Sequence, residues 1–158
     1  MQDRFQRFSL GIFELSRYWH RIAGEEMRRY GLKGPYSVYF TVLHRYPDGL
    51  TPVELSKLAG RDKADVSRAM AALSERGLIE KNTAQKKYRA LLRLTEEGRR
   101  IADQICQKAD AVVEYAGQDL SPKKRAEFYE VLEQIAENLQ KICREDLSPA
   151  NDLEGASK

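Results

Sequence analysis

Residues 51–77 predict two short helices joined by a tight turn, and no other feature of the sequence constrains the fold as strongly. Residues 51–54 (TPVE) form a capping box with proline at the first helical position, which is a strong signal for a helix start. Gly60 is suited to end that helix, and Asp62 is a good N-cap for the next one. The second helix is expected to span residues 63 to about 76, because Gly77 is a favourable residue just past a helix end.

The second of these helices has an apolar face and an opposite face of different chemistry. Val66, Met70 and Leu73 are spaced four and three residues apart, so they are expected to face the core. The opposite face then carries Lys63, Ala64, Ser67, Arg68 and Ala71. Its small residues allow close approach to a surface, and the major groove of B-DNA, about 12 Å wide, admits a helix. Arg68 is long enough to reach a guanine edge, whereas Lys63 and Ser67 suit phosphate or base contacts.

A basic β-hairpin is expected directly after this helix. Ala90, Leu92 and Leu94 recur at every second position, which predicts a strand that pairs with residues 78–81. Across residues 57–93, ten Lys and Arg stand against four Asp and Glu, so this stretch carries +6 in a chain of net charge +3. The basic residues assigned to the hairpin and to the flank of the helix pair are Arg61, Lys86, Lys87 and Arg89.

Each of these signals is common by itself, because a short polar-faced helix is usually a surface helix and a basic hairpin is usually a solvated edge. Their order is more specific: two capped helices followed by a basic hairpin are typical of a winged helix-turn-helix. We therefore expect binding to double-stranded DNA, with the hairpin as the wing. A winged helix used only for protein contact is the alternative, and it predicts DNA binding that is weak and insensitive to salt.

The two ends of the chain predict long amphipathic helices. Apolar residues recur three or four positions apart across residues 5–22, and again across residues 128–142. One small winged domain in a chain of 158 residues could not bury both stripes, so these helices are expected to pair two subunits in a homodimer.

Two shorter helices are expected to contribute to the core of the winged domain. A helix that begins at about residue 35 is expected, with Val38, Val42 and Tyr46 along one side and Leu43 close by. The first capped helix is expected to turn Leu55 and Leu58 inward.

The expected fold class is mainly α with a small β wing, in a single subunit formed by residues 1–146. The winged helix-turn-helix region is expected at about residues 35–95, between dimerisation helices at about residues 3–30 and 96–145. Residues 147–158 are expected to form a flexible tail.

The centre of the chain resembles the multiple-antibiotic-resistance-regulator (MarR) family of bacterial winged-helix transcription factors. The residues that carry the resemblance are DKADVSRAMAALSERGLIEK, followed by the wing and then by LLRLTEEGR. Two further segments fit the same pattern: GLKGPYSVYFTVLHRYPDGLTPVELSKLAG upstream and LSPKKRAEFYEVLEQIAENL downstream. The resemblance therefore extends to about residue 145. It implies a homodimer that binds a pseudo-palindromic operator, usually as a repressor. It also implies release of the DNA when a small ligand binds or when a thiol is oxidised.

Two positions depart from the family pattern. The wings of the family usually carry Asp-x-Arg, whereas this chain has Lys87 two residues before Arg89. Arg89 would therefore enter the minor groove without the aspartate that orients it. Ala64 and Asp65 stand where hydroxyl residues are frequent in the family, and Asp65 is expected to cap its own helix and to repel phosphates.

The family resemblance also directs attention to an effector pocket and to the two cysteines. Small aromatic or phenolic effectors of the family bind between the dimerisation helices and the winged domain. The candidates for such a pocket are Tyr18, Trp19, Tyr36, Tyr39 and Phe40, although aromatic residues at helical spacing are more often core. Cys143 and Cys106 are the candidates for redox sensing, and Cys143 is the better one because Lys141 and Arg144 lie near it.

Other classes of protein are disfavoured by the sequence. His20 and His44 lack the spacing of zinc ligands, and no catalytic triad or phosphate-binding glycine loop is recognisable, so no enzyme activity, cofactor or metal is expected. The N-terminus does not resemble a signal peptide, and no run approaches the roughly 18 apolar residues of a membrane span. Two cysteines fit a reducing compartment, so a cytoplasmic protein without membrane contact is expected.

Overall fold

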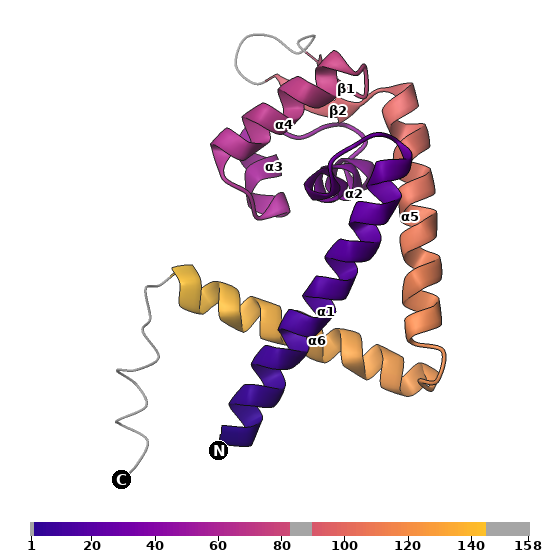
Figure 1. Ribbon diagram of the computed structural model, residues 1–158. Helices are drawn as coiled ribbons and strands as arrows, with labels where there is room; N and C mark the ends of the chain where they lie inside the picture. Colours follow the sequence, from indigo (N-terminus) through magenta and orange to yellow (C-terminus); the bar gives the residue numbers. More distant parts are fainter. Residues whose placement is uncertain (1, 83–89, 145–158) are drawn as a thin grey trace. The chain divides into compact units, whose positions relative to one another are not determined.

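The computed structural model describes residues 2–82 and 90–144 (Figure 1). Its elements, in chain order, are α1 (Gln2–Arg29), the 3₁₀ turn η1 (Gly34–Tyr36), α2 (Ser37–Arg45), α3 (Pro52–Ala59), α4 (Lys63–Glu75), β1 (Ile79–Asn82), β2 (Leu91–Leu94), α5 (Glu96–Ala116) and α6 (Pro122–Arg144). The chain divides into two compact units, Met1–Val112 and Val113–Lys158. The predicted fold class is confirmed, since the protein is mainly helical with a small two-stranded sheet. The predicted tail lies outside the described residues.

The core of the first unit forms where α1, α2, α3, α4 and the sheet contribute apolar side chains. The side chains buried most completely include Met27 of α1, Phe40 and Leu43 of α2, Leu55 of α3, Leu73 of α4 and Leu92 of β2. Figure 1 shows α2, α3 and α4 gathered beside the two strands, the arrangement that brings these residues together. The short elements predicted from the sequence therefore share one core.

Both predicted helix caps between residues 51 and 62 are present. The Thr51 hydroxyl accepts a hydrogen bond from Glu54 N at 3.3 Å, and Thr51 N donates to Glu54 Oε2 at 2.8 Å, which completes the capping box. Asp62 Oδ1 accepts from Asp65 N at 2.7 Å at the start of α4. Gly60 ends α3 in the left-handed conformation, with φ of +60°, which glycine adopts without steric cost.

The wing is an antiparallel pair of strands extended by one further bridge. Ile79 lies opposite Leu94, and Asn82 lies opposite Leu91. Leu92 and Leu94 are buried, as their alternation predicted. Leu50, just before α3, exchanges backbone hydrogen bonds of 2.9 and 2.8 Å with Leu92. This bridge, which the sequence did not predict, attaches the start of the helix pair to the wing.

The buried face of α2 lies beside the stripe of Val38, Val42 and Tyr46. Its buried side chains are Tyr39, Phe40 and Leu43. Val38 and Val42 are only partly buried, and Tyr46 is 37% exposed, so the stripe that they form is not the side buried most deeply. Apolar residues occupy most sides of α2, so their spacing alone could not select the side that meets the core.

The prediction for α3 was half right. Leu55 is fully buried, whereas Leu58 is 48% exposed. The helix has only eight residues, and of the two leucines only Leu55 reaches the core between α2 and α4.

The terminal helices α1 and α6 expose large apolar side chains, each within its own unit. On α1 these are Phe5, Phe8, Leu10, Ile12, Phe13, Leu15, Tyr18 and Trp19. On α6 they are Phe128, Tyr129, Val131, Leu132 and Leu139. Across residues 2–82 and 90–144, none of the helices combines the length and the apolar character that a membrane span requires.

The first turn of α5 lies directly against the backbone of Leu78, which follows α4. A Cβ added at Gly98 would lie 2.0 Å from Leu78 O, far inside van der Waals contact. Thr95 holds the same turn, because its hydroxyl accepts from Gly98 N at 3.0 Å and donates to Gly77 O at 2.7 Å. Only glycine at position 98 allows this close approach of α5 to the backbone.

Gly98→Ala is expected to lower the free energy of unfolding by about 1–3 kcal/mol or more, because the backbone of α5 or of Leu78 must move to admit the methyl group. Urea denaturation measures the change. Gly24→Ala in α1 is the control, since its new Cβ would meet only Arg28 Nη1 at 3.8 Å. That variant is expected to be neutral or stabilised by up to about 1 kcal/mol. Equal destabilisation by the two substitutions would contradict the close approach.

Candidate nucleic-acid interface

Helix α4 has one buried face and one exposed face. Val66, Ala69, Met70 and Leu73 are buried, and they hold the helix against the core. The opposite side carries five exposed residues, which are the ones predicted for a recognition helix: Lys63, Ala64, Ser67, Arg68 and Ala71. The structure therefore brings these five side chains together on one solvent-facing surface, which we call the outer face of α4.

The turn between α3 and α4 is held by hydrogen bonds that fix where α4 begins. Ser56 Oγ donates to Arg61 O at 2.6 Å, and Arg61 N donates to Ser56 O at 3.1 Å. Gly60 makes the reversal between these residues possible through its positive φ. The position of α4 thus depends on α3, as it does in a helix-turn-helix.

The far end of α4 is attached to the end of α1 by Arg76. Its Nη1 donates to Gly31 O at 2.6 Å, and its Nη2 donates to Tyr30 O at 2.8 Å. Both acceptors are backbone carbonyl groups just past the end of α1. Sequence reasoning missed this contact because the residues are about 45 positions apart and no local pattern links them.

A charged pair joins the outer face of α4 to its flank. Arg68 Nη2 donates to Asp65 Oδ1. The expected capping role of Asp65 is filled by Asp62, which accepts from the Asp65 backbone N–H. The Asp65 carboxylate is thus held by Arg68 at the helix surface.

A groove of about 480 Å³ runs between α4 and the sheet. Small side chains of α4 line it, together with two lysines: Ser67, Ala71, Ser74, Lys63 and Lys81. Glu80 also lines the groove, and its carboxylate accepts from Arg93 Nε at 2.7 Å. Such a groove offers cations and little steric obstruction to an anionic chain.

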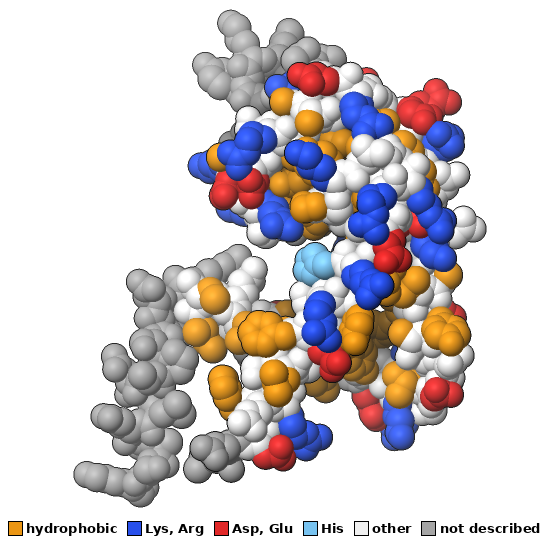
Figure 2. Space-filling model, in the orientation of Figure 1, with side chains coloured by type: hydrophobic (Ala, Val, Ile, Leu, Met, Phe, Trp, Pro, Cys, Tyr) orange, Lys and Arg blue, Asp and Glu red, His pale blue; other side chains and the backbone are white. Residues whose placement is uncertain are grey.

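The surrounding surface carries charges of both signs. Figure 2 shows Lys and Arg side chains spread over the part of the molecule that holds α3 and α4, with Asp and Glu side chains between them. Lys57 and Lys81 are exposed there. The predicted wing residues Lys86, Lys87 and Arg89 lie outside the described residues.

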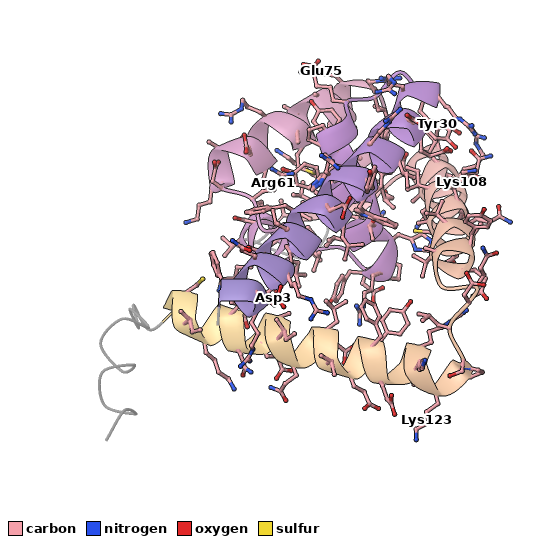
Figure 3. All side chains as sticks on the ribbon, turned by 60° about the horizontal axis from the view of Figure 1, so that its bottom comes forward. Asp3, Tyr30, Arg61, Glu75, Lys108 and Lys123 are labelled. Carbon is pink, nitrogen blue, oxygen red and sulfur yellow. The ribbon has the colours of Figure 1, made fainter. Side chains whose placement is uncertain are left out.

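A cavity of about 360 Å³ lies in the first unit, bordered by α1, α2, α5 and the turn between α3 and α4. Its apolar lining includes Trp19, Ile22, Val38 and Ile105. Charged side chains enter it as well: Glu26, Arg61 and Lys108. Figure 3 labels Arg61 and Lys108, which lie on opposite sides of α1 in that view. Arg61, predicted as a DNA-binding flank, therefore borders this cavity.

Of the aromatic residues predicted for an effector pocket, Trp19 lines the cavity. Tyr39 and Phe40 are core residues, and Tyr36 packs near Tyr39 with 6.4 Å between ring centroids. Tyr18 is exposed. Burial raises the pKa of the Tyr39 hydroxyl above its usual value of 10.0, with Arg61 opposing the shift. The charged residues of the cavity were not predicted, because they come from three separate elements.

The two cysteines lie in different units. Cys106, on α5, is half-buried, and burial together with nearby Asp110 and Asp103 raises the pKa of its thiol. A raised pKa reduces the fraction of reactive thiolate near neutral pH. Cys143, on α6, is exposed. Within the described parts of the chain, no group of three or more His, Cys, Asp or Glu side chains is placed to hold a metal ion.

A helix-turn-helix family model matches residues 31–142, which covers most of the chain, and the protein belongs to this family. Solved structures of MarR family transcriptional regulators have the same fold. One is a MarR transcriptional regulator from Methanosarcina mazei Go1, at 23% identity and TM-score 0.76, covering 87% of this chain and 92% of that one. The predicted resemblance to the MarR fold is confirmed. A search among curated proteins finds no match.

Two further structures with this fold were solved with a bound partner. A putative MarR family transcriptional regulator from Listeria monocytogenes was complexed with 26mer DNA; it is 22% identical, with TM-score 0.75, covering 82% of this chain and 86% of that one. NadR, in complex with 4-hydroxyphenylacetate, is 15% identical, with TM-score 0.70, covering 82% of this chain and 92% of that one. The TM-scores show that these proteins share the fold of this chain.

Proposed function

We propose that this protein is a sequence-specific transcriptional regulator that binds double-stranded DNA by inserting the outer face of α4 into the major groove. The observation that carries the proposal is the exposed set of small, polar and basic side chains on a helix whose other face is fully buried. Such a helix presents its side chains to base edges without obstruction. The Listeria monocytogenes regulator of the same fold, solved with 26mer DNA, supports this reading.

Each part of the interface has a distinct role in the proposal. Arg68 donates to the O6 and N7 atoms of guanine, and Lys63 and Ser67 bind phosphate or base atoms. The backbone N–H groups at the start of α4 attract a phosphate as well. Lys81, with Lys86, Lys87 and Arg89 of the wing, contributes attraction to the backbone, which weakens as salt rises.

The proposed active form is a homodimer paired through α1 and α6. In each unit these helices expose large apolar side chains that would be hydrated in a lone chain. A two-fold dimer would hold two copies of α4 about 34–36 Å apart, one turn of DNA, which suits a pseudo-palindromic operator. Repression of transcription is the proposed outcome, because an operator-bound dimer blocks access to the DNA.

The cavity is the proposed site of a small aromatic effector that releases the operator. Its apolar lining suits a ring, and Arg61 and Lys108 suit a carboxylate or phenolate. Arg61 also belongs to the turn that sets the start of α4, so a ligand there would act on the DNA-binding helix. NadR, solved with 4-hydroxyphenylacetate, has the same fold.

Thiol oxidation is the second proposed signal. The raised pKa of Cys106 disfavours the thiolate, which leaves exposed Cys143 as the candidate. A winged helix that contacts protein alone is the other alternative. It predicts affinity for DNA that changes little with salt, whereas operator binding through phosphates weakens steeply.

Arg68→Ala is expected to cost about 1–3 kcal/mol of operator binding, because a bidentate contact with guanine is lost. The loss falls on a base contact, so the ratio of affinities for operator and for random DNA falls as well. Competition binding at fixed salt, with an operator selected from random duplexes, measures this ratio. Arg100→Ala removes the same charge from α5 and is expected to leave the ratio unchanged. An unchanged ratio for Arg68→Ala would contradict the proposed base contact.

Leu132→Glu is expected to convert a dimer of 18.2 kDa chains into a monomer, because it places a charge on the apolar face of α6. Sedimentation equilibrium gives the mass in solution. Glu133→Gln, at the next position of the same helix, should keep the dimer. If Leu132→Glu retains the mass of a dimer, α6 does not form the subunit contact.

A phenolic acid such as 4-hydroxyphenylacetate is expected to change the fluorescence of Trp19, the only tryptophan of the chain, in a saturable way. The same ligand should lower affinity for the operator. Ala109→Phe places a ring into the cavity and should abolish both effects, with folding checked by circular dichroism. An identical titration curve for wild type and Ala109→Phe would exclude the cavity as the binding site.

A further inference from the structure

A carboxylate lies at the edge of the outer face of α4, where it pairs with Arg68. Arg68 Nη2 donates to Asp65 Oδ1, and residues three apart lie on the same side of a helix. The Arg68 side chain is 69% exposed and the Asp65 side chain is 43% exposed, so both remain accessible from solvent. The group that would meet a DNA groove under the proposed function is therefore an arginine–aspartate pair rather than a lone arginine.

The Asp65 carboxylate is not needed to cap the helix. Asp62 is the N-cap, and its Oδ1 accepts from Asp65 N at 2.7 Å. A carboxylate at the edge of the outer face repels phosphate oxygens, so it opposes binding that depends on the DNA backbone alone. Its position is favourable where DNA offers a hydrogen-bond donor instead.

The major groove offers few donors to a carboxylate. Cytosine presents its N4 amino group, whereas guanine presents the O6 and N7 acceptors and thymine presents the O4 acceptor. Adenine has an amino group at N6, but its N7 acceptor stands beside it and repels a carboxylate. An aspartate therefore favours cytosine, just as an arginine favours guanine.

We propose that Asp65 is a specificity-determining residue that accepts a hydrogen bond from N4 of a cytosine close to the guanine bound by Arg68. This inference rests on the proposed DNA-binding function of α4. Asp65 selects in two ways, because it attracts the cytosine amino group and repels bases that present only acceptors at that place. It also lowers affinity for DNA of any other sequence.

The pair prepares Arg68 for its own contact. A guanidinium group has five N–H donors, and the hydrogen bond to Asp65 occupies one of them, which leaves others for guanine. Holding the side chain near Asp65 before binding reduces the rotamer freedom that is lost on the DNA. Arg68 and Asp65 would thus read neighbouring bases as one unit.

A purely structural role for the pair makes a different prediction. If Asp65 only stabilised α4 through an ion pair, its removal would change the thermal stability of the protein and leave the preferred bases unchanged. If it only repelled phosphates, its removal would strengthen binding to every sequence equally. Base preference at one position is the readout that neither role alters.

The test is selection of bound duplexes from random DNA by the full-length wild type and two variants. Asp65→Asn keeps the shape of the side chain and pairs with adenine, and Asp65→Ala removes the contact altogether. Asp110→Asn makes the same charge change as Asp65→Asn on an exposed position of α5 and is the matched control. Affinities for the selected operator and for random duplex are then measured at one salt concentration.

The wild type is expected to prefer cytosine at one position of each half-site by about tenfold. Asp65→Asn should shift that preference to adenine, Asp65→Ala should abolish it, and both should bind random duplex more tightly. The control should select the wild-type sequence. A variant of Asp65 that keeps the cytosine preference, with specific binding intact, overturns this inference and leaves the proposed function standing. If the wild type selects no sequence, the proposed function fails and the inference fails with it.

Discussion

The burial of Val66, Met70 and Leu73 fixes the rotation of α4 about its own axis. Turning the helix so that Lys63 or Arg68 faced inward would expose these three side chains, at about 1.5–3 kcal/mol each, and would bury a charge. The cap at Asp62 fixes one end of the helix, and the bonds from Arg76 to the end of α1 fix the other. The buried face of α4 therefore determines which residues its outer face exposes. The proposed contacts with DNA thus depend on packing inside the protein.

The contacts at its two ends connect α4 to α1 and to the cavity. Arg76 attaches α4 to the carbonyl groups just past α1, while the turn that contains Arg61 borders both α4 and the cavity. A ligand that moves Arg61, or a partner chain that moves α1, therefore acts on the helix that we propose reads DNA. This arrangement gives a physical route by which an effector could alter operator affinity, through displacement of a rigid helix that is held at both ends.

Local chemistry predicted much of this structure, and contacts distant in sequence explain most of what was missed. Thr51 and Asp62 predict the starts of their helices because their side chains cap them, and Gly60 predicts the turn. Each of these residues acts on backbone only a few positions away. The sequence did not single out the buried side of α2, because its residues are apolar on most sides and only the neighbouring elements decide which side is buried. The family resemblance includes the segment around Gly98. The physical reason for a glycine at position 98, its close approach to Leu78 O, is visible only in the fold. The bonds of Arg76 and the charged lining of the cavity likewise have no local signature.

Photo-crosslinking to a selected operator tests most directly the claim that the outer face of α4 enters the groove. A photoreactive side chain placed at Ala71, whose small exposed side chain faces outward, should join covalently to a base within the operator. The same probe at Gln107, exposed on α5, should give no DNA adduct. If protein carrying the probe at Ala71 still binds the operator but crosslinks only to protein, the outer face does not lie in the groove.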